Sequence, residues 1–267
     1  VGVGGYASGA TLYECSKMGI PCLIREQNSY AGVTNKLLAK RVQKICVAYE
    51  GMDRFFPADR IIMTGNPVRQ NVLDSPLTKE QARESFGLEP DKKTILIVGG
   101  SLGARTMNES VQRHLDIVAE SGLQFIWQTG KYYNAKIMEF MKDKDVPNLK
   151  VLDFISDMGA AYKASDLVIS RAGASSISEF QLIGKPTILV PSPNVAEDHQ
   201  RKNAMALVNR QAALYVEDAE APDKLLPLAV KTVNDDDKLR SLSENVKKMG
   251  LKNSADVIAD EVLKLIK

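Results

Sequence analysis

The 267-residue sequence has little of what several classes of protein need. Three cysteines, an odd number, do not make a disulfide framework, so we expect a reducing, cytoplasmic setting. Cys15, Cys22 and Cys46 lack metal-ligand spacing, and the sequence has only two histidines, which excludes a His-rich metal site. No apolar run approaches the ~20 residues that span a bilayer, and no signal peptide is visible. With 35 Lys and Arg against 33 Asp and Glu, the net charge of +2 gives no overall field that would attract nucleic acid.

What is present is typical of a globular protein. Hydrophobic residues make up 44% of the chain and charged residues 25%, which argues against disorder. At ~150 residues per domain, the length predicts about two domains.

Short β-branched or apolar runs alternate with longer amphipathic stretches along the chain. Strands are expected at 21–25, 44–48, 61–64, 94–98, 125–128, 150–154, 166–170, 187–191 and 213–216. Helices are expected at 8–18, 33–41, 79–86, 104–120, 133–142, 157–164, 176–183 and 199–209, followed by a strandless helical stretch that ends in a helix at 254–266. Several strands are apolar throughout, as in strands buried on both faces of a parallel sheet. The alternation predicts an α/β, doubly wound fold.

The strongest local motif is a buried strand that enters a glycine-rich turn and then a helix, over residues 94–105. Glycines let the backbone approach a ligand, and a helix N-terminus offers free N–H groups. The motif therefore favours a phosphate or diphosphate as the ligand. The alternative is a tight turn without a ligand. NAD and FAD are disfavoured because the next strand ends without the carboxylate that would hold a ribose, and because the spacing misses G-x-G-x-x-G.

Each of two further segments follows a buried strand and leads into a helix. In the first, at 170–179, Ser176 and Glu179 have the spacing of a capping box, and Glu179 is alternatively a ligand for a ribose diol. The second, at 191–204, is a proline-containing loop followed by a polar cluster, in which Asp198 is a candidate N-cap. Polar residues in such places are where open α/β sheets bind ligands.

Six motifs in one order resemble the MurG family of bacterial N-acetylglucosaminyltransferases. They lie at residues 4–9, 26–28, 31–36, 65–69, 99–105 and 171–179. The resemblance implies a GT-B fold with two Rossmann-like doubly wound parallel-sheet domains, the N-terminal one incomplete. It also implies an inverting transfer of GlcNAc from UDP-GlcNAc to the 4-hydroxyl of a lipid-linked muramyl-pentapeptide, which converts lipid I to lipid II in peptidoglycan synthesis.

The same resemblance implies roles for individual residues. Ser101 and Arg69 would contact the donor diphosphate, and the backbone of Ile155 would pair with uracil. Gln200 and, from the opposite domain, Asn28 would contact the GlcNAc. The ribose and phosphate loop would comprise Ala174, Ser175, Ser176, Ile177, Ser178 and Glu179. No cofactor and no metal are implied, because the turn, the helix dipole and Arg69 can together stabilise the leaving diphosphate.

The general base is not identified from the sequence. The family's Gly-Gly-Thr-Gly-Gly-His loop has no match in residues 1–30, and Arg25 stands where the family has a histidine before Glu-Gln-Asn. Arginine does not act as a base at neutral pH. Glu26 is a candidate by location only, and a structural carboxylate at a strand end is the alternative interpretation.

The motif order also suggests a division of the chain. Residues 1–69 would form part of an acceptor- and membrane-side domain, with a helix at 251–267 packing back on it, and residues 70–250 would form the UDP-GlcNAc-binding domain. Because a glycine-rich turn at residues 2–5 follows almost no strand, we expect the chain to begin inside a domain that lacks on the order of a hundred residues. A mostly complete donor site without a complete acceptor site is then expected.

A lipid acceptor implies peripheral contact with the inner membrane on its cytoplasmic side. Residues 1–70 carry nine Lys and Arg and five acidic residues. Lys36, Lys40 and Lys44 recur at helical spacing beside Arg41, which suits either an anionic membrane surface or an ordinary solvated face. Two other functions stay open: a GT-B UDP-sugar enzyme of the epimerase type, and a non-catalytic UDP-sugar-binding module.

Overall fold

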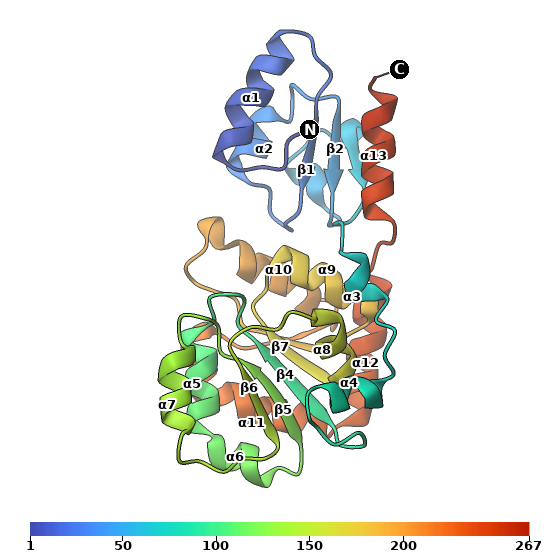
Figure 1. The fold of residues 1–267 in the computed structure, drawn as a ribbon. Helices are drawn as coiled ribbons and strands as arrows, with labels where there is room; N and C mark the ends of the chain where they lie inside the picture. The colour runs from blue at the N-terminus through green and yellow to red at the C-terminus, as the bar shows by residue number, and fades with distance from the viewer. Residues whose placement is uncertain (267) are drawn as a thin grey trace.

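The computed structural model describes residues 1–266 and contains two parallel sheets, stacked along the length of the molecule (Figure 1). The smaller sheet has the order β1-β2-β3. It is built from β1 (Leu23–Glu26), β2 (Lys44–Val47) and β3 (Ile61–Met63), with Gly2 pairing in parallel with Ile24 as an isolated bridge. Helices α1 (Tyr6–Lys17) and α2 (Val33–Leu38) pack with it around a core that includes Leu12, Ile24 and Ile45.

The larger sheet has six strands in the order β6-β5-β4-β7-β8-β9, and all its pairs are parallel. Its strands are β4 (Thr94–Val98), β5 (Gln124–Gln128), β6 (Leu149–Leu152), β7 (Leu167–Ser170), β8 (Thr187–Leu189) and β9 (Leu214–Tyr215). This is the Rossmann order, in which the direction of winding reverses between the first and fourth strands, here β4 and β7. The predicted α/β fold with two parallel sheets is confirmed, and the N-terminal sheet is the smaller one.

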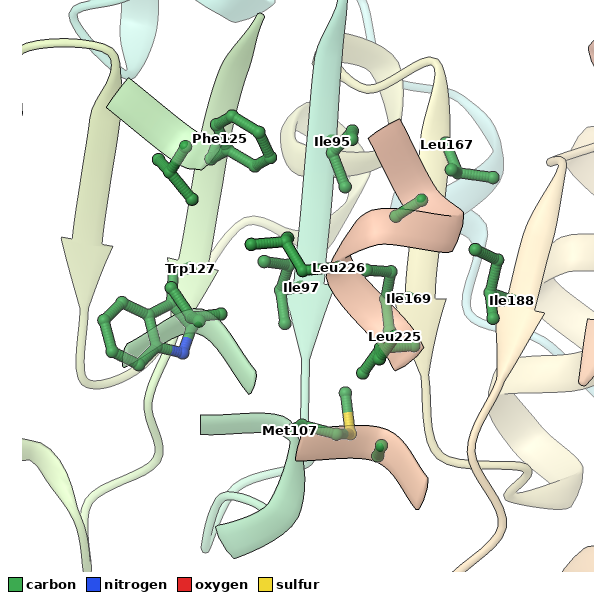
Figure 2. Packing of buried hydrophobic residues seen from close by; sticks show 14 of the residues in the cluster. Ile95, Ile97, Met107, Phe125, Trp127, Leu167, Ile169, Ile188, Leu225 and Leu226 are labelled. Carbon is green, nitrogen blue, oxygen red and sulfur yellow. The ribbon is translucent and has the colours of Figure 1, made fainter. Parts of the chain in front are cut away.

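Both faces of the larger sheet are buried, which explains why the central residues of β4, β5 and β7 are apolar. Ile95, Ile97, Phe125, Trp127, Leu167 and Ile169 point to one face and pack on Met107, Leu225 and Leu226 (Figure 2). The residues between them, such as Leu96, Ile126 and Val168, belong to the core on the other face. Because side chains alternate between two buried faces, the polar residues of β4, β5 and β7 stand at the strand ends, as Thr94, Gln124, Gln128 and Ser170 do.

The remaining helices are divided between these two cores. One face carries α5 (Arg105–Arg113), α6 (Leu115–Glu120), α7 (Asn134–Met141) and α11 (Ala221–Val233). The other carries α3 (Gln70–Leu73), α4 (Lys79–Ser85), α8 (Met158–Ala164), α9 (Ala174–Ile183), α10 (His199–Val208) and α12 (Asp236–Lys248). Short 3₁₀ turns occur at Met52–Arg54, Ala58–Arg60, Ala196–Asp198 and Asp218–Glu220.

The last helix, α13 (Ser254–Lys264), returns along the chain and lies beside the smaller sheet, where Figure 1 shows it in red. A Cβ added at Gly65 would stand 2.7 Å from the Ser254 hydroxyl, so the start of α13 packs closely on the loop that follows β3. Among residues 1–266, no helix combines the length and apolar character needed to cross a membrane.

The nine predicted strands are all present, with ends that shift by a few residues. Two helix predictions are wrong in extent. The helix expected at 104–120 is two helices, because the backbone leaves helical geometry at His114 (φ −113°, ψ 35°). The helix expected at 33–41 ends at Leu38, so Lys40 lies in a turn and Lys44 begins β2. The basic residues therefore do not form a helical stripe.

Candidate functional site

The two glycine-containing turns singled out in the sequence flank the point where the sheet order reverses. One follows β4 at residues 99–104, and the other follows β7 at residues 171–173. Loops diverge at such a switch point and leave a crevice at the carboxyl ends of the strands, where doubly wound sheets bind their ligands. The fold thus brings both motifs to one place although about 70 residues separate them.

The turn after β4 depends on glycine for both conformation and space. Gly100 and Gly103 have positive φ angles of 86° and 84°, and Gly103 N–H donates to the Gly100 carbonyl at 2.9 Å. A Cβ on Gly103 would stand 2.1 Å from the Thr129 carbonyl oxygen, so the turn packs backbone to backbone on the loop after β5. Gln128 holds the same turn by donating its amide N–H to the Gly100 carbonyl at 3.2 Å.

This turn presents unused hydrogen-bond donors. Ser101 is exposed at its tip. The N-cap of α5 is Ala104, whose side chain makes no capping hydrogen bond, so the first-turn N–H groups of this helix have no side-chain partner. A helix N-terminus with free N–H groups favours an anion.

The predicted capping box at Ser176 and Glu179 is wrong. The helix begins earlier, with Gly173 as an extended N-cap (φ −69°, ψ 142°) and without a side-chain cap, so Ser176 and Glu179 both lie inside α9. Glu179 is buried and accepts a hydrogen bond from the Tyr162 hydroxyl at 2.7 Å. Burial and the neighbouring Glu179 carboxylate raise the pKa of Tyr162, so this hydroxyl stays a donor.

The second oxygen of Glu179 lies 3.8 Å from an Arg69 Nη, and the Arg69 side chain is 66% exposed. Arg69 immediately precedes α3, on the chain that links the two sheets. Arg69 and Glu179 therefore lie side by side, and they are joined there by Tyr162, which no motif indicated.

The rest of the predicted loop divides between exposed and buried positions. Ser175 is exposed, and Ala174 and Ser176 are partly exposed, so these three can reach a ligand. Ile177 is fully buried in the core. The Ser178 hydroxyl is already used: it donates to the Ala174 carbonyl and accepts from the Asn66 amide, both at 3.0 Å.

Ile155 lies just after β6 with its side chain buried. Within residues 1–266, none of the backbone hydrogen bonds in loops, helices or strands uses its N–H or carbonyl. A backbone donor and acceptor at a strand end can pair with the edge of a base.

Gln200 stands in the first turn of α10, and its side-chain carbonyl accepts from the Ala172 N–H at 3.2 Å and the Ser192 N–H at 2.9 Å. These bonds join the loops after β7 and β8 and leave the amide N–H₂ of Gln200 to other partners. The Asp198 side chain makes no capping bond, because Asp198 has a left-handed backbone (φ 53°); the N-cap interpretation is wrong in that respect.

The carboxyl edge of the smaller sheet is arranged differently. Glu26 is buried, and its two oxygens accept from the Gly32 N–H at 2.9 Å, the Asn35 amide at 2.8 Å and the Asn28 N–H at 3.1 Å. With both oxygens occupied by donors of its own loop, Glu26 has the contacts of a structural carboxylate. The geometry favours that interpretation over a general base.

Two asparagines missed in the sequence connect the two sheets. Asn203 is fully buried: its carbonyl oxygen accepts from the Ser29 N–H at 2.9 Å, and its amide donates to the Asn28 side chain at 3.0 Å. Asn66 accepts from Arg25 at 2.7 Å and donates to Ser178. Asn28 therefore lies against α10, a helix that packs on the larger sheet.

Among the described residues, no group of three or more His, Cys, Asp or Glu side chains is placed to hold a metal ion. The positions around the crevice offer backbone N–H groups, hydroxyls, the exposed Arg69 and the buried carboxylate of Glu179. Such a set can bind an anionic diphosphate beside a diol.

Comparisons with known proteins agree with this arrangement. The family model described as glycosyltransferase family 28 C-terminal domain matches residues 94–260, and the corresponding N-terminal domain model matches residues 1–47. A protein of Bacteroides fragilis named UDP-N-acetylglucosamine--N-acetylmuramyl-(pentapeptide) pyrophosphoryl-undecaprenol N-acetylglucosamine transferase is 63% identical over 267 residues. That match covers 99% of this chain and 70% of the relative.

Solved structures show the same likeness. MurG from Acinetobacter baumannii superposes with a TM-score of 0.78 at 32% identity, over 98% of this chain and 72% of that one. A UDP-GlcNAc 2-epimerase from Neisseria meningitidis, bound to UDP-GlcNAc, has a TM-score of 0.69 at 16% identity over 99% of this chain and 75% of that one, and so shares the fold. The chain therefore belongs to glycosyltransferase family 28, as a member of its MurG group of N-acetylglucosamine transferases.

Proposed function

We propose that this chain transfers GlcNAc from UDP-GlcNAc to the 4-hydroxyl of undecaprenyl-diphospho-MurNAc-pentapeptide, with inversion at the sugar. The 63% identity to a transferase named for these substrates carries the proposal. The crevice between the loops after β4 and β7 supports it, because its donors suit the diphosphate of a nucleotide sugar.

The donor would lie along the carboxyl edge of the larger sheet. Ser101 and the N-terminus of α5 would bind the diphosphate, the backbone of Ile155 would pair with uracil, and Glu179 would accept hydrogen bonds from the ribose diol. Ala174, Ser175 and Ser176 would face the ribose and phosphate, whereas Ile177 and Ser178 would support the loop from within the core. Gln200 and Asn28 would contact the GlcNAc from opposite sides.

In the reaction, negative charge grows on the diphosphate as the bond to the sugar breaks. Preorganised N–H groups at a helix N-terminus stabilise such charge without having to reorient. Arg69 adds a cation, held near the ribose side by Glu179 3.8 Å away. The base that takes the acceptor proton is not among the residues assigned here, since Glu26 is bound within its own loop.

We propose further that residues 1–69 with α13 form the acceptor side and residues 70–250 the donor-binding side. Basic groups gather around Tyr13 on the acceptor side, where the Lys17 ammonium and the Arg41 guanidinium each lie 4.4 Å from its ring centroid. Met18, just after α1, and Leu37, on α2, are exposed at 73% and 74%. Exposed apolar groups beside cations suit an anionic membrane surface on the cytoplasmic side of the inner membrane.

The function is tested by incubating the full chain with UDP-GlcNAc, with and without lipid I, and measuring UDP release and labelled lipid. The expected result is UDP release that needs lipid I, with GlcNAc appearing on the lipid. Epimerised sugar or UDP released without acceptor would favour an epimerase-type enzyme, and binding without turnover would favour a binding module.

The membrane contact is tested by sedimentation with phosphatidylglycerol vesicles. Reversing two charges with Lys40→Glu and Arg41→Glu should weaken binding at least tenfold, at ~1 kcal/mol for each basic residue near the surface. The matched control is Lys136→Glu on α7, an exposed lysine on the donor side. Equal binding by the double variant and the control would contradict this surface assignment.

A further inference from the structure

A second cavity lies away from the crevice, at the junction between the two sheets. It has a volume of about 800 Å³ and is lined by the linker at residues 66–75, by α8, by the end of α9 and by residues 251–256. The linker and the 251–256 segment are the two places where the chain passes between the larger sheet and the elements around the smaller one. None of the glycine-turn residues 99–103 lines this cavity.

The lining carries an excess of positive charge. Lys79, Lys163, Lys185 and Lys252 line the cavity, against Asp74 and Asp256. The negative charge of Asp166 acts on Lys185, but this carboxylate is already shared between Lys79 and Arg83, the latter at 2.8 Å. These two cations hold the pKa of Asp166 below its usual value, against the effect of burial.

Lys185 is the innermost of the four lysines. Its ammonium donates to the Ser165 carbonyl at 2.7 Å, and no carboxylate among the described residues forms an ion pair with it. Burial, together with the positive charges of Lys79 and Lys163, lowers the pKa of Lys185 to about 7. A cation held in this environment gains from any anion that enters the cavity.

Neutral donors add to the lysines. Residues 253–256 line the cavity at the start of α13, whose N-cap Asn253 makes no side-chain capping bond, so first-turn N–H groups are available there. Ser75 also lines the cavity, and its hydroxyl is buried without a hydrogen-bond partner. An uncapped helix N-terminus beside lysines and a hydroxyl is a suitable donor set for a phosphate group.

We infer that this junction cavity is a second binding site, for a phosphate-bearing small molecule held by Lys185, Lys163 and the N-terminus of α13. A ligand there would contact both chain segments that connect the two halves of the molecule and so restrict their relative movement. Tyr162 is a link between the two sites, since it lines the cavity while its hydroxyl donates to Glu179.

The test is calorimetric titration of inorganic pyrophosphate into the full chain saturated with UDP, so that the crevice is occupied. One pyrophosphate should bind per chain. Lys185→Met keeps the side-chain length and removes a desolvated charge, so the fold tolerates it, and it should weaken pyrophosphate binding at least about tenfold. Lys163→Glu, at an exposed position, should have a similar effect.

The control Lys136→Glu makes the same charge change on α7 and should leave pyrophosphate binding within twofold. Unchanged affinity in both cavity variants, or no binding to the native chain at millimolar pyrophosphate, would overturn the proposal. Loss of UDP affinity together with pyrophosphate affinity would also overturn it, because the two sites would then not be separate. In hydrogen exchange, pyrophosphate should slow residues 251–256, and no change there would count against the site.

Discussion

At the carboxyl edge of the six-stranded sheet, the turn after β4 leaves hydrogen-bond donors without side-chain partners. At the same edge of the three-stranded sheet, the carboxylate that ends β1 has both of its oxygens bound by nearby donors. Ser101 is exposed and α5 lacks a side-chain cap. Glu26, by contrast, holds donors from Gly32, Asn35 and Asn28. A carboxyl edge of a parallel sheet is therefore a place where a site can form, and the loop's own hydrogen bonds decide whether its groups are free for a ligand.

Among the substitutions that test this comparison, the largest loss of ligand affinity is expected at Glu179. Glu179→Ala should weaken UDP-GlcNAc binding about a hundredfold, since it removes charge-assisted bonds to a ribose diol. Calorimetry with UDP-GlcNAc measures it, with Glu139→Ala on α7 as the matched control. Unchanged affinity would remove Glu179 from the donor site.

At the other edge, Glu26→Gln should lower the free energy of unfolding by ~2 kcal/mol. A glutamine amide would face the N–H donors of Gly32 and Asn35, so at least one buried donor would lose its acceptor. Urea unfolding measures the change, with Glu50→Gln on the surface as a control. A variant as stable as the native chain that has lost turnover would instead mark Glu26 as the base.

Away from both carboxyl edges, Lys185 precedes β8 and makes stability depend on pH. Below pH 7 the amine is protonated in both the folded and the unfolded chain. Burial of the charged amine then lowers the free energy of unfolding by an amount that does not change with pH. Above the lowered pKa of about 7, the folded chain releases a proton that the unfolded chain keeps up to about 10.5, so the unfolding free energy rises with pH.

Lys185→Met should abolish that rise. The unfolding free energy of the native chain should therefore increase by ~3 kcal/mol relative to the variant between pH 7 and pH 10. Urea unfolding of both proteins at several pH values gives the difference, in which the titration of all other groups cancels. A difference that stays constant with pH would show that Lys185 keeps its ordinary pKa in the fold.

The smallest effect is expected at Tyr162, whose hydroxyl donates a hydrogen bond to Glu179. Tyr162→Phe removes one hydrogen bond of 2.7 Å and keeps the ring in the core, so UDP-GlcNAc affinity should fall about fivefold with little loss of stability. A decrease as large as that of Glu179→Ala would mean that the hydroxyl itself contacts the ligand.

Much of this architecture could be predicted from the sequence because it depends on local patterns. Continuous apolar runs such as residues 95–98 identified strands with two buried faces, and glycines marked the turn after β4. The start of α9 was misplaced because Ser176 and Glu179 match a capping box, while Gly173 begins the helix without any side-chain cap. The break at His114 lies inside an uninterrupted helical pattern and leaves no signal.

Contacts between distant segments were beyond prediction from pattern alone. Tyr162 reaches Glu179 from a different helix, and Asn203 reaches Ser29 across 174 residues. Such partners depend on how whole elements pack, which no local spacing encodes. Asn203 stood within a polar cluster that the sequence did single out, but its burial and its role as a bridge appear only in three dimensions.

Hydrogen exchange of the full chain with and without UDP-GlcNAc tests the contrast between the two edges most directly. The account predicts that the donor slows exchange in residues 99–105, 153–156 and 172–179, with Ile155 among the protected amides, and much less across residues 29–35. Protection confined to the loop after β1, with none at the carboxyl edge of the larger sheet, would contradict it.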